Sequence, residues 1–334
     1  MPKTTLVFGV TYHGSTDLAV TGLDNAFSKH ISAQNLQNQL AWLAGRFNIL
    51  TISEILDRAR SGSLPSKTAF VVFHDGYRSN YLTAFPLLKA LGLHADFFIP
   101  TAFIGTGRKF WVDMLDAALK YTSVESIKLS SDQGEEVLPL HNDAQRLAAS
   151  QRLRNRLKAL PESSFATEFS RIINELGWSD PSDVPKLGDH TMCMDWDQVR
   201  EMAGAGMDIG SHTHNHTICA TQSEQVVREE MSKSKEMIEG ETGRQCVNFC
   251  YPNGHFPNAG NEATDHLAKE LGYQSVLYMM SAANLVHPDT FRLTGVAFGD
   301  ETPLDKLPRT LSRLRFFGRR RRGDKIWAWE KDSI

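Results

Sequence analysis

The densest group of chemically active side chains is Gly210-Ser211-His212-Thr213-His214-Asn215-His216. Imidazole nitrogen is the commonest neutral ligand of borderline divalent cations. His212 and His216 are four residues apart, so they face the same side if the segment turns helically. The hydroxyl of Thr213 is suited to fixing such a loop by a local hydrogen bond. The spacing favours a metal site, and a polar loop with solvated histidines is the alternative.

A second group is Phe73-His74-Asp75-Gly76-Tyr77, which directly follows the apolar run at 68–73 (TAFVVF). On its own, an aspartate followed by glycine is typical of a turn. Together with His212 and His216, however, Asp75 would give a divalent cation three protein ligands. Three ligands leave a coordination position open for water, which is typical of catalytic rather than structural sites.

A third group is Phe249-Cys250-Tyr251-Pro252-Asn253-Gly254, at the end of another apolar run. Pro-Asn-Gly is a common way to close a strand with a turn. In the functional interpretation, the backbone N–H of Tyr251 stabilises an oxyanion and its ring forms a wall of the site.

Short apolar runs alternate with helical patterns over most of the chain, and these elements must position the three groups. Near-continuous apolar strands between helices predict a parallel α/β fold, either a barrel or an open sheet. In both folds chemistry gathers at the carboxyl ends of the strands, where all three groups stand. Ser53 is predicted to cap a helix. We expect strands at 4–10, 49–52, 68–73, 95–99, 207–210, 247–251, 275–278 and, as the last, 291–297; we expect helices at 36–47, 81–91, 196–203, 224–241 and 263–271.

The stretch at about 112–190 differs from the rest, because it is rich in Leu, Arg, Lys and Glu and has no clear strand pattern. It is predicted to be a helical insertion or lid. The expected organisation is therefore a domain over 1–308 that contains this insertion, followed by a basic, aromatic tail over 309–334.

In this order the three groups resemble the motifs of NodB-type polysaccharide deacetylases, carbohydrate esterase family 4. That family has a T-F-D-D-G-like first motif, an H-[ST]-x-x-H second motif and a third motif rich in proline and tyrosine. Within the family, the chain is most similar to the branch that acts on exopolysaccharides. The resemblance covers roughly residues 5–300. Further segments that carry it are Tyr12-His13, Ala95-Asp96-Phe97-Phe98-Ile99 and Phe110-Trp111-Val112-Asp113.

The resemblance implies a distorted (β/α) barrel with seven or so parallel strands. It also implies one divalent metal ion held by Asp75, His212 and His216, with zinc as the first choice; cobalt, nickel and iron accept the same ligands. Water activated there would attack the amide carbonyl of an N-acyl group, most simply N-acetyl, on a sugar. A backbone N–H of the third motif, that of Tyr251, would stabilise the oxyanion.

Two positions depart from the family pattern. The family's general base is an acid where this chain has His74, whose imidazole can serve as base, reach the metal, or mark a loss of catalysis. The family's late motif carries an acid histidine, whereas the corresponding stretch at 293–298 (LTGVAF) has none. His13 is the first candidate to replace it, because it ends a strand on the predicted active face. His255 comes second and His287 third.

The resemblance also places substrate contacts around the three motifs. Aromatic rings stack on pyranose faces, although tryptophan more often packs in a core. Trp111 is expected near the site, with Phe110 as another wall, and Trp196 is expected in the core. The remaining candidate substrate-binding residues are Tyr77, Pro252, Asn253, Gly254 and His255.

Composition bounds the partners and the compartment. The formal net charge of −3 gives no bias toward nucleic acid. The N-terminal residues do not have a secretory pattern, no run reaches the roughly 18–20 apolar residues of a membrane span, and the four cysteines form no C-x-x-C pair. A cytoplasmic protein is expected. Arginines 319–322, interleaved with aromatic residues, suit an anionic membrane surface or phosphate groups, and a solvated tail is the alternative.

Three hypotheses follow for function. The first is a metal-dependent de-N-acylase acting on a nucleotide-linked or lipid-linked sugar during cell-surface polysaccharide assembly. The second is a carbohydrate-binding protein with a degenerate site, suggested by His74 and by the missing late histidine. The third is a hydrolase of the same fold that acts on a non-sugar amide.

Overall fold

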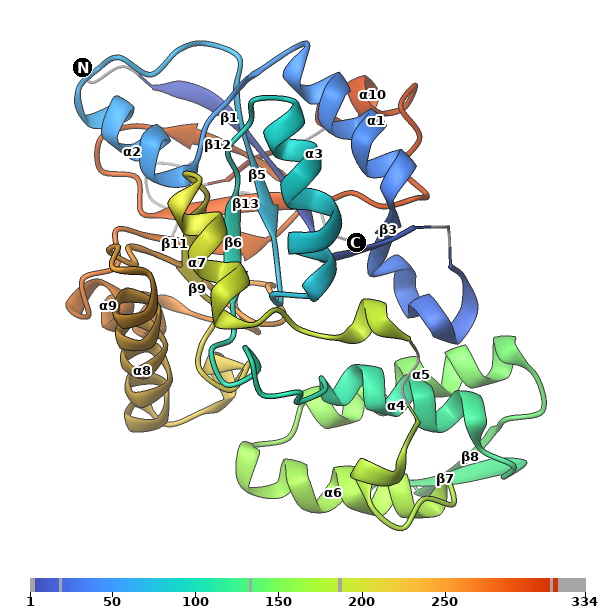
Figure 1. Ribbon diagram of the computed structural model, residues 1–334. Coiled ribbons are helices and arrows are strands. Elements are labelled where there is room, and N and C mark those ends of the chain that lie inside the picture. The colour runs from blue at the N-terminus through green and yellow to red at the C-terminus, as the bar shows by residue number, and fades with distance from the viewer. Residues whose placement is uncertain (1–3, 18–19, 132–133, 186–187, 313–314, 318–334) are drawn as a thin grey trace.

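The computed structural model describes residues 4–17, 20–131, 134–185, 188–312 and 315–317. Its centre is a closed barrel of seven parallel strands (Figure 1). The barrel closes because β1 pairs with β5 on one side and with β13 on the other. In order around the barrel the strands are β1 (Thr5–Tyr12), β5 (Thr68–Phe73), β6 (Asp96–Ile99), β9 (Asp208–Ser211), β10 (Asn248–Cys250), β11 (Ser275–Met279) and β13 (Arg292–Ala297). The predicted barrel of about seven parallel strands is thereby confirmed.

Strand β5 illustrates why this sequence forms a barrel. All six of its residues are buried, since alternate side chains face the barrel interior and the surrounding helices. A strand covered on both faces must be almost entirely apolar, as the run at 68–73 is after Thr68. The chain then needs a polar, sharply turning segment to leave the strand, and this segment carries His74 and Asp75.

Further strands extend this sheet. Strand β12 (Ala282–Val286) runs antiparallel to the first half of β1, β14 (Arg315–Phe317) pairs with β12, and β4 (Asn48–Ile49) pairs with β5. Neither β12 nor β14 was expected, so the prediction that 291–297 is the last strand is wrong. Strands β2 (Gly14–Thr16) and β3 (His30–Ser32) form a separate small sheet.

Helices cover the outside of the barrel (Figure 1). Helix α2 begins at a capping box formed by Thr51 and Glu54, so Thr51 and not Ser53 is the cap. Ser53 instead donates to the carboxylate of Asp208 over 2.5 Å. The covering helices are α1 (Ala33–Ala44), α2 (Ile52–Arg60), the π-helical turn η2 (Asn80–Ala84), α3 (Phe85–Ala90), α7 (Trp196–Gly204), α8 (Glu224–Thr242), α9 (Glu262–Glu270) and α10 (Leu307–Ser312); short 3₁₀ helices are η1 (Gly22–Ser28), η3 (Pro181–Asp183), η4 (Asp189–Thr191) and η5 (Cys219–Thr221).

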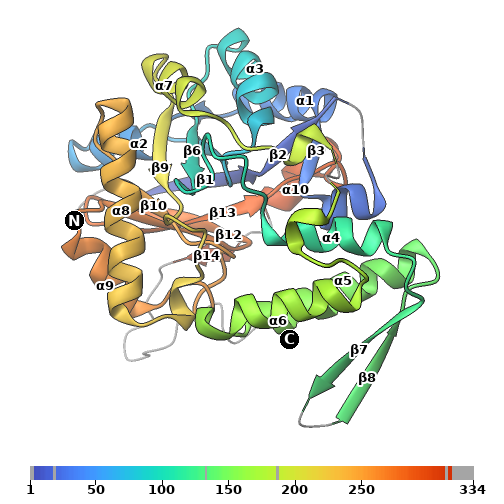
Figure 2. The ribbon, with the colours of Figure 1, turned by 60° about the horizontal axis from the view of Figure 1, so that its bottom comes forward.

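The part of the segment between β6 and β9 that spans residues 111–175 lies together on one side of the barrel (Figures 1 and 2). It has an apolar core of its own, in which Leu115, Leu153 and Ile172 are fully buried. Its elements are α4 (Trp111–Tyr121), β7 (Ser126–Ser131), β8 (Gly134–Pro139), α5 (Asp143–Lys158) and α6 (Glu162–Glu175). The expectation of helices without strands is wrong, because β7 and β8 form an antiparallel hairpin that projects from the body. We call residues 111–175 the insertion.

Within the described part of the chain, no helix has the length and apolar character to cross a membrane. The arginines at 319–322, and the membrane-surface role predicted for them, lie outside the described residues. That role and the cytoplasmic location stay predictions.

Candidate metal centre

The three residues predicted to hold a metal ion meet at the carboxyl end of the barrel. The Oδ1 atom of Asp75 lies 3.2 Å from Nε2 of His216 and 3.4 Å from Nε2 of His212. One potential ligand atom from each residue lies within 4.8 Å of the others. Asp75 follows β5 and His212 follows β9, so two strands separated by β6 bring together residues far apart in the sequence.

Left-handed backbone conformations aim these side chains. Asp75 has φ of +70°, Thr213 of +62° and His216 of +61°, values that non-glycine residues adopt rarely. The loop after β9 is therefore not helical, and the pair of histidines converges through these turns rather than on a helix face. The backbone N–H of Thr217 donates to the Thr213 hydroxyl over 2.9 Å, so Thr213 closes the loop as expected.

Hydrogen bonding fixes the tautomer of His212. Its Nδ1 lies 2.7 Å from the carbonyl oxygen of Cys250. A carbonyl only accepts, so Nδ1 carries the proton and Nε2 is left with its lone pair toward Asp75. A metal-ligating histidine normally has this second partner, which orients the ring and raises its basicity.

The electrostatics of the site match the protonation states that ligands need. Burial lowers the pKa of His212, which keeps the imidazole neutral. Burial alone would raise the pKa of Asp75, but the adjacent His212 and His216 side chains outweigh it and hold that pKa well below its usual value. The site thus offers a carboxylate and neutral imidazole nitrogen, a donor set that suits a divalent ion.

Aromatic rings behind His216 hold it in place. The ring of Phe110 meets the His216 imidazole edge to face, with centroids 5.1 Å apart, and stacks on Phe103 at 4.3 Å. Phe110 is almost fully buried. The expectation that it forms a wall of a sugar cleft is therefore wrong, because packing against His216 occupies its faces. Trp196 packs against the core at the start of α7, as expected.

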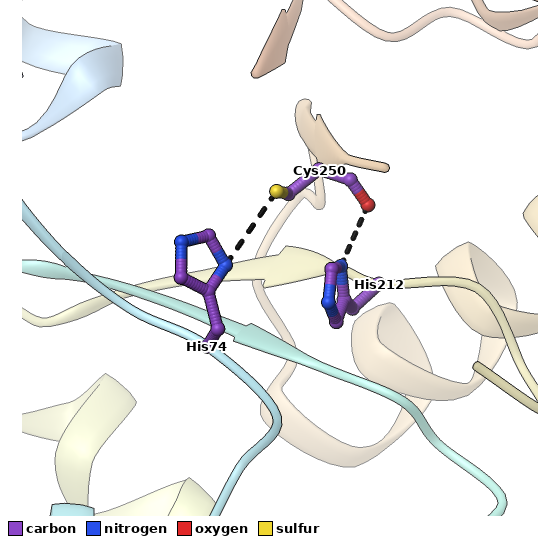
Figure 3. Close-up of side chains that lie close together, drawn as sticks. All are labelled: His74, His212 and Cys250. Atoms are coloured by element: carbon purple, nitrogen blue, oxygen red, sulfur yellow. Dashed lines mark hydrogen bonds between the residues drawn. The ribbon is translucent and has the colours of Figure 1, made fainter. Parts of the chain in front are cut away.

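His74 lies beside the three ligands and contacts the third motif. Its Nδ1 is 3.5 Å from Sγ of Cys250 (Figure 3). The Cys250 thiol also contacts the Tyr251 carbonyl, 3.8 Å away, and the donor in its contact with Nδ1 of His74 is set by the imidazole tautomer. The remaining nitrogen, Nε2, is buried without a hydrogen-bond partner among the described residues, and in Figure 3 it points away from Cys250 and His212. Burial lowers the pKa of His74 well below its usual value, so the ring is neutral.

His13 is the only one of the three candidate acids that contacts His74 in the described part of the chain. The two rings lie 5.2 Å apart between centroids, and burial lowers the pKa of His13. His255 is exposed and lines a separate pocket with Asn253. His287 follows β12, whose end pairs with the start of β1, so it lies at the opposite end of the barrel. The first choice, His13, thus lies at the site.

Two predicted site tyrosines are buried away from any cleft. The backbone N–H of Tyr251 donates to the Leu277 carbonyl over 3.3 Å, and its fully buried hydroxyl donates to Asp265. Tyr251 is therefore neither an oxyanion donor nor a wall in this structure. Tyr77 is also fully buried and donates to Asp113 over 3.1 Å. A substrate-binding role for Tyr77 is ruled out by the same burial.

Two pockets open beside the metal centre. The first, of about 380 Å³, lies between the insertion and the barrel; Trp111 and His216 line it, so Trp111 stands near the site as predicted. The second contains Asn253 and His255. Pro252 and Gly254, on either side of Asn253, are buried and do not line that pocket. The sequence analysis missed Lys158, which lines both pockets, and Arg108, which lines the first.

Comparison with known families gives one match, to the polysaccharide deacetylase model over residues 61–276. The chain belongs to this family. Membership confirms the resemblance drawn from the motifs and the prediction of a carbohydrate deacetylase. None of the curated protein sequences matches the chain significantly.

Solved structures similar to this deacetylase share its fold. The Streptococcus pyogenes deacetylase PplD, in complex with acetate, is 15% identical with a TM-score of 0.61, over 92% of this chain and 99% of that one. The Bacillus cereus polysaccharide deacetylase BC0361 is 16% identical with a TM-score of 0.57, over 92% of this chain and 69% of that one. IcaB from Ammonifex degensii is 18% identical with a TM-score of 0.56, over 92% of this chain and 96% of that one.

Proposed function

We propose that this deacetylase is metal-dependent and removes an N-acyl group, most simply N-acetyl, from a sugar used in cell-surface polysaccharide or glycolipid synthesis. The observation that carries the proposal is the convergence of Asp75, His212 and His216 at the barrel mouth. A buried ionised carboxylate and two imidazoles so close together are expected to share a cation.

The donor set fits a divalent ion, with zinc as the first choice. When bound, the ion would supply Lewis acidity, which polarises the amide carbonyl and makes water acidic enough to ionise near neutral pH. The protein's own contribution is to fix the ligands. The Cys250 carbonyl orients His212, and the ring of Phe110 supports His216.

His74 and His13 are suited to move protons beside the ligands. In the tautomer with Nδ1 protonated toward the Cys250 sulfur, Nε2 of His74 is an acceptor, and a neutral imidazole can take a proton from an attacking water. His13 contacts the His74 ring and is the candidate to protonate the departing amine. The missing late histidine is then replaced from the first strand rather than from the last.

Metal analysis combined with acyl release tests this function. Purified protein is expected to contain close to one divalent ion per chain and to release acetate from N-acetylated sugars or formate from N-formylated ones. The His212→Ala variant is expected to lose both the ion and the activity while keeping its circular dichroism spectrum. Activity that persists in metal-free protein would refute the proposal.

A second candidate, a carbohydrate-binding protein without catalysis, is favoured by one observation. The Tyr251 N–H, which the resemblance assigns to the oxyanion, is already used by the Leu277 carbonyl. On this alternative, metal-loaded protein binds saccharides without releasing acyl product, and His74→Asp gains activity. Activity of the unaltered protein that exceeds that of His74→Asp would exclude it.

A further inference from the structure

The pocket between the insertion and the barrel carries positive charge beside the metal centre. Arg108, Lys109 and Lys158 line it, and His216 forms part of the same wall. None of the described residues that line this pocket is an aspartate or a glutamate. Three cations in one concave surface, without an acid, raise the local concentration of anions.

The two cations nearest the loops of the site bind neutral oxygen atoms. Arg108 donates to the side-chain carbonyl of Asn215 over 3.0 Å, and Lys158 donates to that of Asn253 over 2.6 Å. In the described part of the chain neither forms an ion pair with a carboxylate. An amide oxygen leaves the positive charge uncompensated, so both groups can bind an anion without first breaking a salt bridge.

Lys158 joins two chemically different pockets. The second pocket is lined by several asparagine carboxamides, whereas the first pocket is lined by aromatic rings. Carboxamides donate and accept hydrogen bonds and therefore suit sugar hydroxyls. The rings of Trp111 and Phe165 meet edge to face at 5.4 Å, and Phe165 stacks on Phe169 at 5.8 Å. The carboxamide-rich pocket and the aromatic pocket therefore meet at Lys158.

We propose that this cleft binds a saccharide linked through phosphate to an apolar or planar group, with Arg108 and Lys158 on the phosphate. The sugar would lie toward Asn253 and the metal centre, and the group beyond the phosphate would pack on Trp111 and Phe165. The inference rests on the proposed deacetylase function and names its substrate class. Two sources share this chemistry, a nucleotide sugar and an isoprenoid-diphosphate-linked sugar.

Calorimetric titration with sugar-free probes tests the anion site without requiring turnover. The probes are inorganic pyrophosphate, UDP and farnesyl diphosphate. UDP or farnesyl diphosphate is expected to bind more tightly than pyrophosphate, and the tighter of the two identifies the source. Lys158→Met and Arg108→Met are each expected to weaken binding about tenfold, the loss of one charge-assisted contact, whereas Lys158→Arg retains it.

Two controls separate the alternatives. Lys128→Met removes the same charge from the β7–β8 hairpin of the insertion and should leave binding unchanged. His212→Ala removes a metal ligand, so binding that persists in this variant does not take place at a metal ion. Probe affinity that Lys158→Met and Arg108→Met leave unaltered, or absence of binding by all three probes, overturns the inference.

Acetate release from neutral chitooligosaccharides is measured in parallel. Acetate release without probe binding would leave the proposed function standing and reject the phosphate site.

Discussion

The barrel mouth and the insertion pocket are adjacent but differ in construction. The metal centre is built from turns that directly follow buried strands, and Asp75 and His212 are almost fully buried. The pocket is half built from helices of the insertion, and its cations are partly or fully exposed. Residues of the insertion that line the pocket can therefore be substituted without altering the ligands on the barrel turns. On the proposed function, the barrel would fix the reaction, whereas the insertion would select the substrate.

The two regions also treat charge differently. At the mouth, the buried negative charge of Asp75 faces His212 and His216, and a bound cation would neutralise it. In the pocket, Arg108 and Lys158 contact neutral oxygens and a ring, and neither forms an ion pair with a described carboxylate. Changes at the mouth should therefore affect metal content and the rate of the chemical step, and changes in the pocket should affect substrate affinity.

The largest effect is expected from Asp75→Asn. An amide is isosteric with the carboxylate but uncharged, so the variant should lose the metal ion and about a thousandfold or more of the acyl-release rate. Metal content by mass spectrometry and acetate release measure the two effects. Asp57→Asn, an exposed aspartate on α2, is the matched control and should behave as the unaltered protein. A fully active, metal-loaded Asp75→Asn variant would show that the barrel mouth does not control metal binding and the chemical step.

The next effect is expected from His74→Ala. Loss of a general base typically costs about a hundredfold to ten-thousandfold, so kcat should fall within this range while metal content is retained. Probe affinity in the pocket should not change, because His74 does not line it. An unchanged kcat would remove His74 from catalysis, and a gain in His74→Asp would point to the carbohydrate-binding alternative.

The same contrast explains how much the sequence alone could predict. Strand β5 was predicted at its observed bounds, because five consecutive apolar residues after Thr68, followed by a polar turn, leave few alternatives. The ligands could be found because they follow strands directly, and parallel strands end at one mouth. His74 and Cys250 were also visible as neighbours of motif residues, but their contact depends on three-dimensional packing.

The missed features have in common that no local pattern marks them. Lys158 ends a helix whose sequence also contains Arg152, Arg154 and Arg156, and nothing in that run distinguishes the residue that reaches Asn253. In the β7–β8 hairpin, polar and apolar residues alternate only from Ser126 to Ser130, and five of the six residues of β8 are exposed, so the strand pattern is too short to stand out. Tyr77 stands in a motif, and only the fold shows that its ring is buried.

A smaller effect is expected from Phe110→Leu, which removes the ring behind His216. The histidine would lose its edge-to-face support, and loss of such a supporting contact is expected to weaken metal binding about tenfold. Competition with a chelator measures this affinity. Leu115→Ala perturbs the insertion core without touching a ligand and controls for general loosening. Equal metal affinity in Phe110→Leu and the unaltered protein would show that the turn alone positions His216.

The smallest effect is the pH dependence of anion binding. Burial, aided by the charge of Arg154 and opposed by that of Asp75, lowers the pKa of Lys158 to about 8. The amine is therefore charged below this pH and neutral above it, so its contribution to anion affinity is present at pH 7 and lost as the pH rises through 8. If that charge contributes tenfold, affinity for farnesyl diphosphate should fall about fivefold between pH 7 and pH 9.

Neighbouring groups do not produce the same dependence. His255, on the loop after β10, has its pKa lowered by partial desolvation of its ring and by the charge of Lys158, so it is already neutral at pH 7. Arginine guanidinium groups in general do not lose their charge in this range. Ionisation of the probe itself strengthens binding as pH rises, which is the opposite direction. Lys158→Arg keeps its charge and should therefore show no loss between pH 7 and pH 9; the same decline in this variant would assign the dependence to another group and remove Lys158 from the anion site.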